Sequence, residues 1–149
     1  MNDATDRTLL DRALAMLRDG DGARAQTILD DLFRRHPDSL EVRLVLGAGL
    51  LRAEDHARAL DHFRFVATQV PSLLAAHFNA GLCLRALGRL PEALDAFHAA
   101  LRSRPGDGRS LVHAIKTMVD LGEVEEAIRF HADAVAGRSE EHTSELQSH

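Results

Sequence analysis

The stretch from Leu74 to Asp107, LAAHFNAGLCLRALGRLPEALDAFHAALRSRPGD, contains the pattern that decides the fold. Its marker residues are Gly81, Gly88, Ala93, Phe97, Ala100, Leu101 and Pro105. At the same offsets, 34 residues earlier, stand Gly47, Glu54, Ala59, Phe63, Val66, Ala67 and Pro71. A further step back gives Ala13, Gly20, Ala25, Leu29, Leu32, Phe33 and Pro37, and a step forward gives Ile115, Gly122, Ala127, His131, Ala134 and Val135. A fixed period of this length is typical of stacked helix pairs rather than of a closed globule.

Each copy is predicted to form two helices joined by a tight turn. The apolar and small residues of the clearest copy recur three or four positions apart, which places them on one face of a helix. Gly88 stands where the first helix must end, and Pro91 falls in the first turn of the second, where its missing N–H matters least. The helices are expected at residues 6–19, 22–36, 40–53, 56–70, 74–87, 90–104, 108–121 and 124–136.

The recurring small residues and the phenylalanines are expected to pack together. Gly47 and Gly81 allow two helix backbones to approach closely, and Phe63 and Phe97 are predicted to fill the space beside them. The sequence therefore predicts a core that runs as a continuous strip between neighbouring helices.

These residues resemble the tetratricopeptide repeat family, whose pattern has small or apolar residues at positions 8, 20 and 27, an aromatic residue at 24 and proline at 32. Residues 40–73 and 74–107 match this pattern well. Residues 6–39 match it with Leu29 in place of the aromatic residue. The tryptophan that the family usually has at position 4 is absent from every copy.

The fourth copy, residues 108–137, is interpreted as degenerate or truncated, with His131 at the aromatic position and no proline. Residues 1–5 precede the first copy as a short lead. The resemblance implies an all-α fold, a right-handed superhelix (solenoid) of about four repeats.

The last residues, Arg138 to His149, break the period and carry no apolar stripe. A polar C-terminus that frays is one interpretation. The string also resembles the conceptual translation of a sequencing adapter, which would make residues 138–149 a non-native tail. We expect this tail to contribute nothing to stability or binding.

The net charge of −5 over 149 residues argues against a general nucleic-acid binder. The residues after Met1 lack the apolar segment of a signal peptide, and no apolar run is long enough to span a bilayer. We therefore expect no membrane insertion and a cytoplasmic location. The oligomeric state stays open.

The sequence has only weak candidates for metal-binding or catalytic motifs. The chain has nine histidines, but pairs such as His56 and His62 are six residues apart, which does not place two metal ligands on one helical face. Cys83 is the single cysteine and is expected to pack between helices. The sequence shows no phosphate-binding loop and no nucleophile motif. We therefore expect no metal, no cofactor and no enzymatic activity within these residues.

The resemblance implies that the first helix of each copy builds a concave wall, at positions 2, 5, 9, 12 and 13 of the repeat. The predicted groove residues are Leu10, Leu44, Phe78, Leu82, Arg52, Arg85 and, at position 6 of its copy, Asn79. Phe78 is the aromatic residue of this mostly apolar row and is predicted to be its anchor. For any one of these residues, packing between neighbouring first helices explains the pattern equally well.

Two hypotheses for function follow. The first is a scaffold that binds a protein or peptide partner in a concave, largely apolar groove with a basic rim. The second is a partner- or substrate-recruiting arm of a larger enzyme, such as a bacterial sulfotransferase or glycosyltransferase. Reading the gene beyond the codon for Gly137 distinguishes them.

Overall fold

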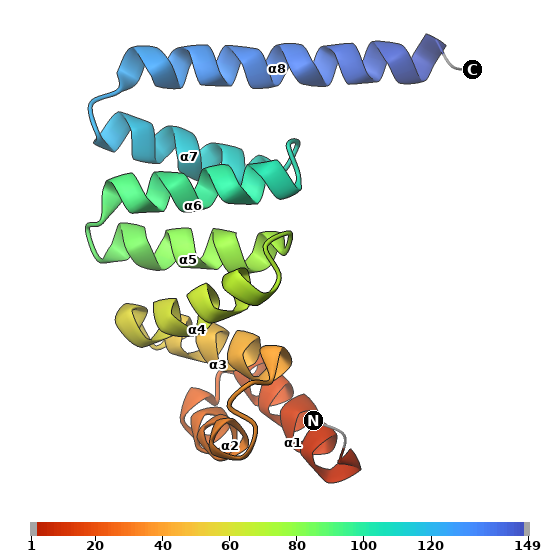
Figure 1. Ribbon diagram of the computed structural model, residues 1–149, viewed down its shortest axis with the longest axis vertical. Coiled ribbons are helices and arrows are strands. Elements are labelled where there is room, and N and C mark those ends of the chain that lie inside the picture. The colour runs from red at the N-terminus through yellow and green to blue at the C-terminus, as the bar shows by residue number, and fades with distance from the viewer. Residues whose placement is uncertain (1–2, 148–149) are drawn as a thin grey trace.

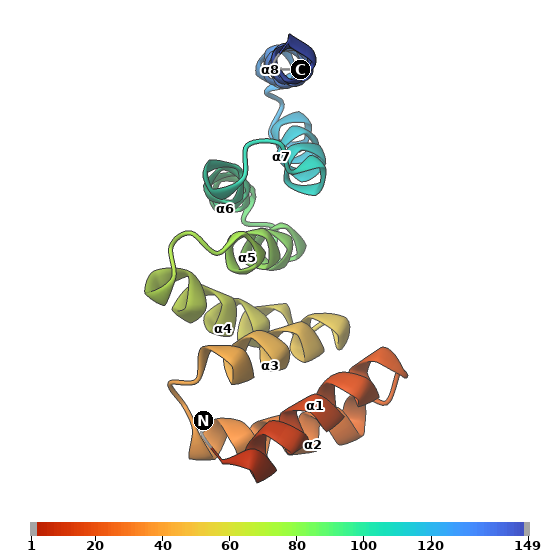
Figure 2. The same cartoon turned by 90° about the vertical axis from the view of Figure 1, so that its right-hand side faces the viewer.

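The computed structural model of the protein describes residues 3–147, with the side chains of that range other than 141–145 and 147. Within this range the chain forms helices joined by turns, stacked as antiparallel pairs (Figures 1 and 2). The helices are α1 (Ala4–Arg18), α2 (Gly22–Arg35), α3 (Leu40–Arg52), α4 (His56–Gln69), α5 (Leu74–Ala86), α6 (Leu90–Ser103), α7 (Gly108–Asp120) and α8 (Val124–Gln147). The expected right-handed, all-α solenoid of about four repeats is confirmed.

The first seven helices lie where the sequence predicts them, with ends that differ by one or two residues. We name the odd-numbered helices, which open each repeat, the A helices, and the even-numbered ones the B helices. Polar side chains cap most of the helix starts. For example, the Asp107 carboxylate accepts a hydrogen bond from the Ser110 backbone N–H at 2.9 Å.

The turn inside each repeat needs a left-handed residue. Gly88 has φ +74°, and Gly20 and Gly122 take similar angles in their repeats. The second repeat has Glu54 at this position, with φ +61°, a conformation that disfavours a side chain. The common period therefore imposes the same turn on a residue that is poorly suited to it.

Close contact between a glycine and a phenylalanine joins the two helices of the central repeats. A Cβ atom on Gly47 would lie 2.9 Å from the Phe63 ring, and one on Gly81 would lie 2.6 Å from the Phe97 ring. Both rings are fully buried. The predicted pairing of small residues with phenylalanines is therefore present, and it sets the spacing between these helices.

Arg43 occupies position 4 of the second repeat, where the family usually has tryptophan. Its guanidinium carbon lies 3.6 Å from the centroid of the Phe65 ring and 5.0 Å from that of Phe33. Its Nε donates a hydrogen bond to the Pro37 carbonyl oxygen at 2.7 Å. The flat guanidinium thus takes over part of the packing that an indole ring would provide.

The predicted end of the last helix, residue 136, is wrong. α8 continues from Val124 to Gln147 and extends past the ends of the other helices in Figure 1. Residues 138–147 contain no proline and several good helix formers, so no residue stops the helix. Arg138, Ser139 and Glu140 are exposed along this extension.

Candidate partner-binding groove

The A helices lie next to one another along the stack. α3 contacts α1 on one side and α5 on the other. α5 is joined to α7 by an ion pair between Arg85 and Asp120, 2.5 Å from nitrogen to oxygen, and by a contact between the Phe78 and His113 rings. Consecutive A helices therefore form one continuous wall, which we name the A wall.

Two of the predicted groove residues are buried inside this wall. Leu10 and Phe78 are only 2% and 3% exposed. Phe78 is covered because α7 places His113 against it, with ring centroids 5.3 Å apart, and Arg109 lies over its ring at 4.3 Å. The expectation that Phe78 is an accessible anchor therefore disagrees with its burial, and its ring instead joins α5 to α7.

The other predicted groove residues reach the surface. Leu44, Leu82, Asn79 and Arg85 are partly exposed, and Arg52 is exposed. The structure adds three apolar residues that the sequence placed in the same row but did not select as sites. These are Leu14, 40% exposed, and Val112 and Val119, 49% and 48% exposed. The valines are open because no A helix follows α7 in the described part of the chain.

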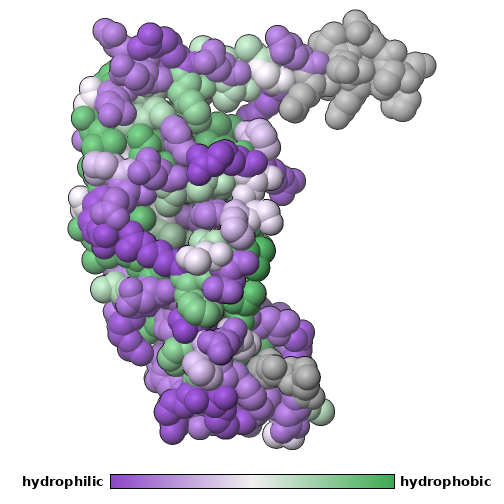
Figure 3. Space-filling view, viewed as in Figure 1, coloured by the Kyte–Doolittle hydropathy of each residue, from purple (hydrophilic) through white to green (hydrophobic). Residues whose placement is uncertain are grey.

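Basic side chains border the A wall. Arg7 pairs with Glu41 at 2.5 Å, so these two charges join the first and second repeats. Arg52 donates a hydrogen bond to the Leu17 carbonyl oxygen at the end of α1. The side chains of Arg18, Arg109 and Lys116 are exposed. In the view of Figure 3, hydrophobic and hydrophilic residues are intermixed on the surface of the stack.

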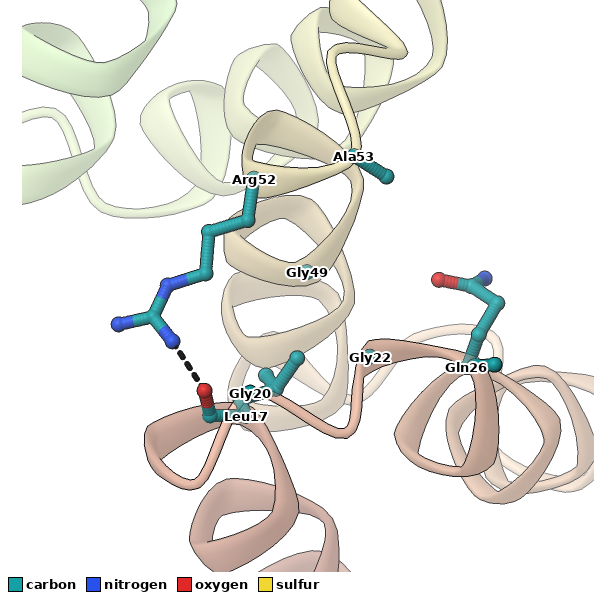
Figure 4. Close-up of a pocket in the computed structure, with 8 residues that line it drawn as sticks. Leu17, Gly20, Gly22, Gln26, Gly49, Arg52 and Ala53 are labelled. Atoms are coloured by element: carbon teal, nitrogen blue, oxygen red, sulfur yellow. Dashed lines mark hydrogen bonds between the residues drawn. The ribbon is translucent and has the colours of Figure 1, made fainter.

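A pocket of about 460 Å³ opens at one end of the A wall, between the first and second repeats (Figure 4). Its lining residues are Leu17, Gly20, Gly22, Ala23, Gln26, Gly49, Arg52 and Ala53. One repeat later, the positions of Gly22, Gln26, Gly49 and Ala53 are taken by the larger or more apolar His56, Leu60, Cys83 and Leu87. The pocket therefore exists because the first junction uses small residues where the next uses larger ones.

A second cavity, of about 530 Å³, lies between α6, α7 and α8. His98 of α6 stacks on Phe130 of α8 in its lining, with ring centroids 5.5 Å apart. Leu101, Arg102 and Asp133 also line it. This cavity is formed mainly by B helices and is separate from the A wall.

The cysteine and two of the histidines, whose side chains could react or titrate, lie largely buried between helices. Burial raises the pKa of the Cys83 thiol to about 11, which keeps it protonated and non-nucleophilic at neutral pH. Burial also lowers the pKa of His62 and of His113, so both are neutral at pH 7. Among residues 3–147 no cluster of three or more His, Cys, Asp or Glu side chains could hold a metal ion. In the same residues, every helix is too short or too polar to cross a membrane.

Comparison with known proteins agrees with the repeat fold. Two tetratricopeptide repeat profiles match, one over residues 6–49 and one over residues 49–108, and together they span more than half of the chain. No curated protein sequence matches.

Solved MamA structures have a similar fold. MamA AMB-1 is 27% identical with a TM-score of 0.79, and the alignment covers 90% of this chain and 75% of that one. MamA MSR-1 is 27% identical with a TM-score of 0.81, covering 92% and 82%. MamA from Desulfovibrio magneticus RS-1 is 21% identical with a TM-score of 0.83, covering 90% and 76%. On its repeat pattern, its fold and these matches, the chain belongs to the tetratricopeptide repeat family.

Proposed function

We propose that the protein is an interaction scaffold that binds an apolar segment of a protein partner along the A wall, with acidic residues of that segment beside the basic border. One observation carries the proposal. Leu14, Val112 and Val119 are 40% to 49% exposed on the same wall as the partly exposed Leu44 and Leu82. An apolar row that water reaches is more typical of a binding surface than of a solvated helix face.

The charges on the wall indicate the chemistry of the partner. Arg18, Arg52, Arg109 and Lys116 are exposed there. Arg7 and Arg85 are paired with carboxylates of neighbouring A helices. The positive charge open to a partner therefore comes from the four residues named above, on a chain whose net charge is −5. Acidic residues in a partner would steer its approach, whereas the apolar row would supply most of the affinity. The pocket beside Arg52 offers room for one apolar side chain of the bound segment.

A displayed library of random peptides, selected on the immobilised chain, tests this function. We expect enrichment of peptides with large apolar residues and neighbouring Asp or Glu. The double variant Val112→Glu, Val119→Glu should weaken their binding by at least about tenfold, which corresponds to about 1.4 kcal/mol, because it replaces two apolar contacts by charges that repel acidic peptides. Leu87→Glu is the matched control, because Leu87 is 40% exposed but lies at the turn after α5, outside the A wall.

Helicity of each variant is checked first by circular dichroism. If the selected peptides bind the folded double variant as tightly as the native chain, the A wall is not the binding surface. The cavity between α6, α7 and α8 would then be tested next.

A further inference from the structure

The cavity between α6, α7 and α8, which we name the α6–α8 cavity, lies where a guanidinium is bound between the first and second repeats. In that earlier junction Arg43 is partly buried, with its guanidinium against the rings of Phe33 and Phe65. Two periods further along the chain, the positions of these three residues are taken by Leu111, Leu101 and Asp133. All three line the α6–α8 cavity. The junction between the third and fourth repeats therefore lacks the guanidinium that the first junction contains.

A backbone acceptor lacks its usual donor at the same place. The Arg43 Nε donates a hydrogen bond to the Pro37 carbonyl oxygen at 2.7 Å, and one repeat later the His77 Nε2 lies 2.7 Å from the Pro71 carbonyl oxygen. The equivalent carbonyl of the third repeat belongs to Pro105, which lines the α6–α8 cavity. The side chain of the fourth repeat that would bind it is that of Leu111, which has no donor.

The lining of the cavity suits a flat cation on an aliphatic stem. Phe130 and His98 stack with their ring planes only 5° from parallel. The Asp133 carboxylate is exposed, and no side chain in the described part of the chain forms an ion pair with it. A guanidinium stacks on aromatic faces and donates several N–H groups to carboxylate and carbonyl oxygens, while its stem packs on apolar side chains.

Two arginines of the chain lie nearby, and the cavity remains open beside them. Arg102 lines the cavity but is exposed, and its counterpart Arg34 accompanies Arg43 at the first junction, where it pairs with a carboxylate of its own helix. A second positive charge at this position is therefore compatible with a bound guanidinium. The Arg138 guanidinium lies near Gly108, where a Cβ would be 3.9 Å from its Nη2, and Arg138 is not part of the lining.

The opening of the cavity does not depend on the side of α8 that faces away from the stack. Between the second and third repeats, a cleft of about 440 Å³ lies at the equivalent place. Its lining includes Arg64, Ala67, Thr68, His77, Ala96 and Ala99, the counterparts of residues that line the α6–α8 cavity. This cleft stays open although α7 follows α6. A helix packed on α8 as α7 packs on α6 would therefore leave the α6–α8 cavity accessible.

We propose that the α6–α8 cavity binds the guanidinium of an arginine side chain of a protein partner. The Phe130 ring stacks on the guanidinium plane, and the Asp133 carboxylate and the Pro105 carbonyl oxygen accept its N–H groups. The occupant is an arginine within a polypeptide because that is the group which fills the first junction. This site is separate from the A wall and does not depend on the function proposed above.

NMR titration of the isotopically labelled full chain tests the site. The probe is a short peptide, blocked at both ends, with one arginine flanked by serine and glycine. Matched peptides carry citrulline, which keeps the shape of arginine without its charge, or lysine. We expect the arginine peptide to shift the backbone amides near Leu101 and Phe130 in a saturable way, and the other two to bind at least about fivefold more weakly. Equal binding of the citrulline peptide, or no shift with the arginine peptide at millimolar concentration, would overturn the proposal.

Two variants of single carboxylates on α8 locate the charge that the arginine contacts. Asp133→Asn should weaken binding of the arginine peptide by at least about threefold, an effect limited by the exposure of this carboxylate. Glu125→Gln removes an exposed carboxylate of the same helix outside the cavity and should bind as the native chain does. Adding Phe130→Leu to Asp133→Asn should remove saturable binding. Equal losses in Glu125→Gln and Asp133→Asn would indicate attraction to the acidic chain as a whole and contradict the site.

Two further measurements separate this proposal from its alternatives. Free arginine should bind no more tightly than the peptide, and tighter binding would indicate a small-molecule site and overturn the assignment to a protein partner. The Val112→Glu, Val119→Glu variant should retain the shifts at the cavity, and Asp133→Asn should retain the peptides selected on the A wall. Loss of one binding activity without the other would therefore show which of the two sites is wrong.

Discussion

The third and fourth repeats have the same order of helix, turn and helix but pack their helices differently. In the third, Gly81 lets α5 approach α6 so closely that the buried Phe97 ring fills the space between them. In the fourth, the same two positions are Ile115, which is partly buried, and His131, which is exposed. A bulkier residue replaces the glycine and a polar one replaces the aromatic anchor.

This difference indicates that the repeat period specifies the arrangement of helices and that individual side chains determine how tightly each pair is held. The largest buried side chains of the chain include Phe63 and Phe97 of the central repeats. Stability should therefore be concentrated there and decline towards α8. The predictions below test that gradient.

Phe97→Ala should destabilise the protein by about 3–5 kcal/mol, because it leaves a cavity between α5 and α6, which Gly81 allows to lie close together. Urea denaturation followed by circular dichroism measures the loss. The equivalent change in the fourth repeat, His131→Ala, should stay within about 0.5 kcal/mol, since His131 is exposed. A loss below about 1 kcal/mol for Phe97→Ala would mean that the ring is not a central part of the core.

Backbone amides of α7 and α8 should exchange hydrogen more readily than those of α5 and α6. We expect their opening free energies to be lower by at least about 1 kcal/mol, because the fourth repeat lacks the glycine–phenylalanine contact. Native-state hydrogen exchange read by mass spectrometry resolves the four helices. Uniform protection from α5 to α8 would show that the two packing arrangements are equally stable.

Gly81→Ala should destabilise the protein by about 1–2 kcal/mol, although alanine is the better helix former. The new Cβ would lie 2.6 Å from the Phe97 ring, which must then move. Gly137→Ala is the matched control, since nothing lies within 4 Å of a Cβ at that position in α8. Thermal denaturation should show a lower Tm for the first variant and an unchanged or higher Tm for the second. A change of Tm in the same direction for both variants would contradict the role of Gly81 in close packing.

Acidification below about pH 6.5 should destabilise the protein partly through His113, which lies between the third and fourth repeats. Burial, and then Arg85, Lys116 and Arg109, lower the pKa of His113 below its ordinary value of 6.5. The unfolded chain therefore takes up the proton more readily, so this contribution to stability is complete above pH 6.5 and declines as the pH falls towards the folded-state pKa.

The midpoint of urea denaturation, measured above and below pH 6.5, gives the change in stability. His113→Gln should reduce the change in midpoint between the two conditions, although His62, whose pKa burial also lowers, should retain part of it. An identical pH response in the native chain and the variant would exclude a contribution from His113.

The smallest effect is expected from deleting residues 138–149. The described side chains at the start of this segment, Arg138 to Glu140, are exposed, and α8 extends past the other helices there. The Tm of the shortened chain should equal that of the full chain within error. A fall of several degrees would show that the segment docks on the repeats and would remove the physical support for a non-native tail.

Phe78 and Val112, at the same position of the third and fourth repeats, show how much of a site the sequence can predict. The row at positions 5, 9, 12 and 13 was visible in the sequence, and Leu44, Leu82, Arg52 and Arg85 do reach the surface. Phe78 belongs to the same row, but its exposure depends on α7, which covers it with His113 and Arg109. Val112 is open at the equivalent position because the described chain has no further A helix to cover it.

Asp6 shows the same limit for charged residues. As an acidic residue near the start of a helix, it looks like a surface group, yet it is 3% exposed. His36 lies 2.6 Å from its carboxylate and Arg35 pairs with it, and these hydrogen bonds lower the pKa of Asp6. Its partners are about thirty residues away, and no local pattern brings them together.

By itself, the sequence determined the first seven helices, the turns within the repeats and the glycine–phenylalanine contacts, because these depend on residues within one 34-residue period. Local rules of periodicity, capping and turn geometry are sufficient for such features. Only the tertiary structure decided which apolar residues stay exposed, since exposure depends on whether a helix from the next repeat covers them. Phe78 and Val112 have the same position in their repeats, and one is buried and the other open because an A helix follows α5 but none follows α7 in the described chain.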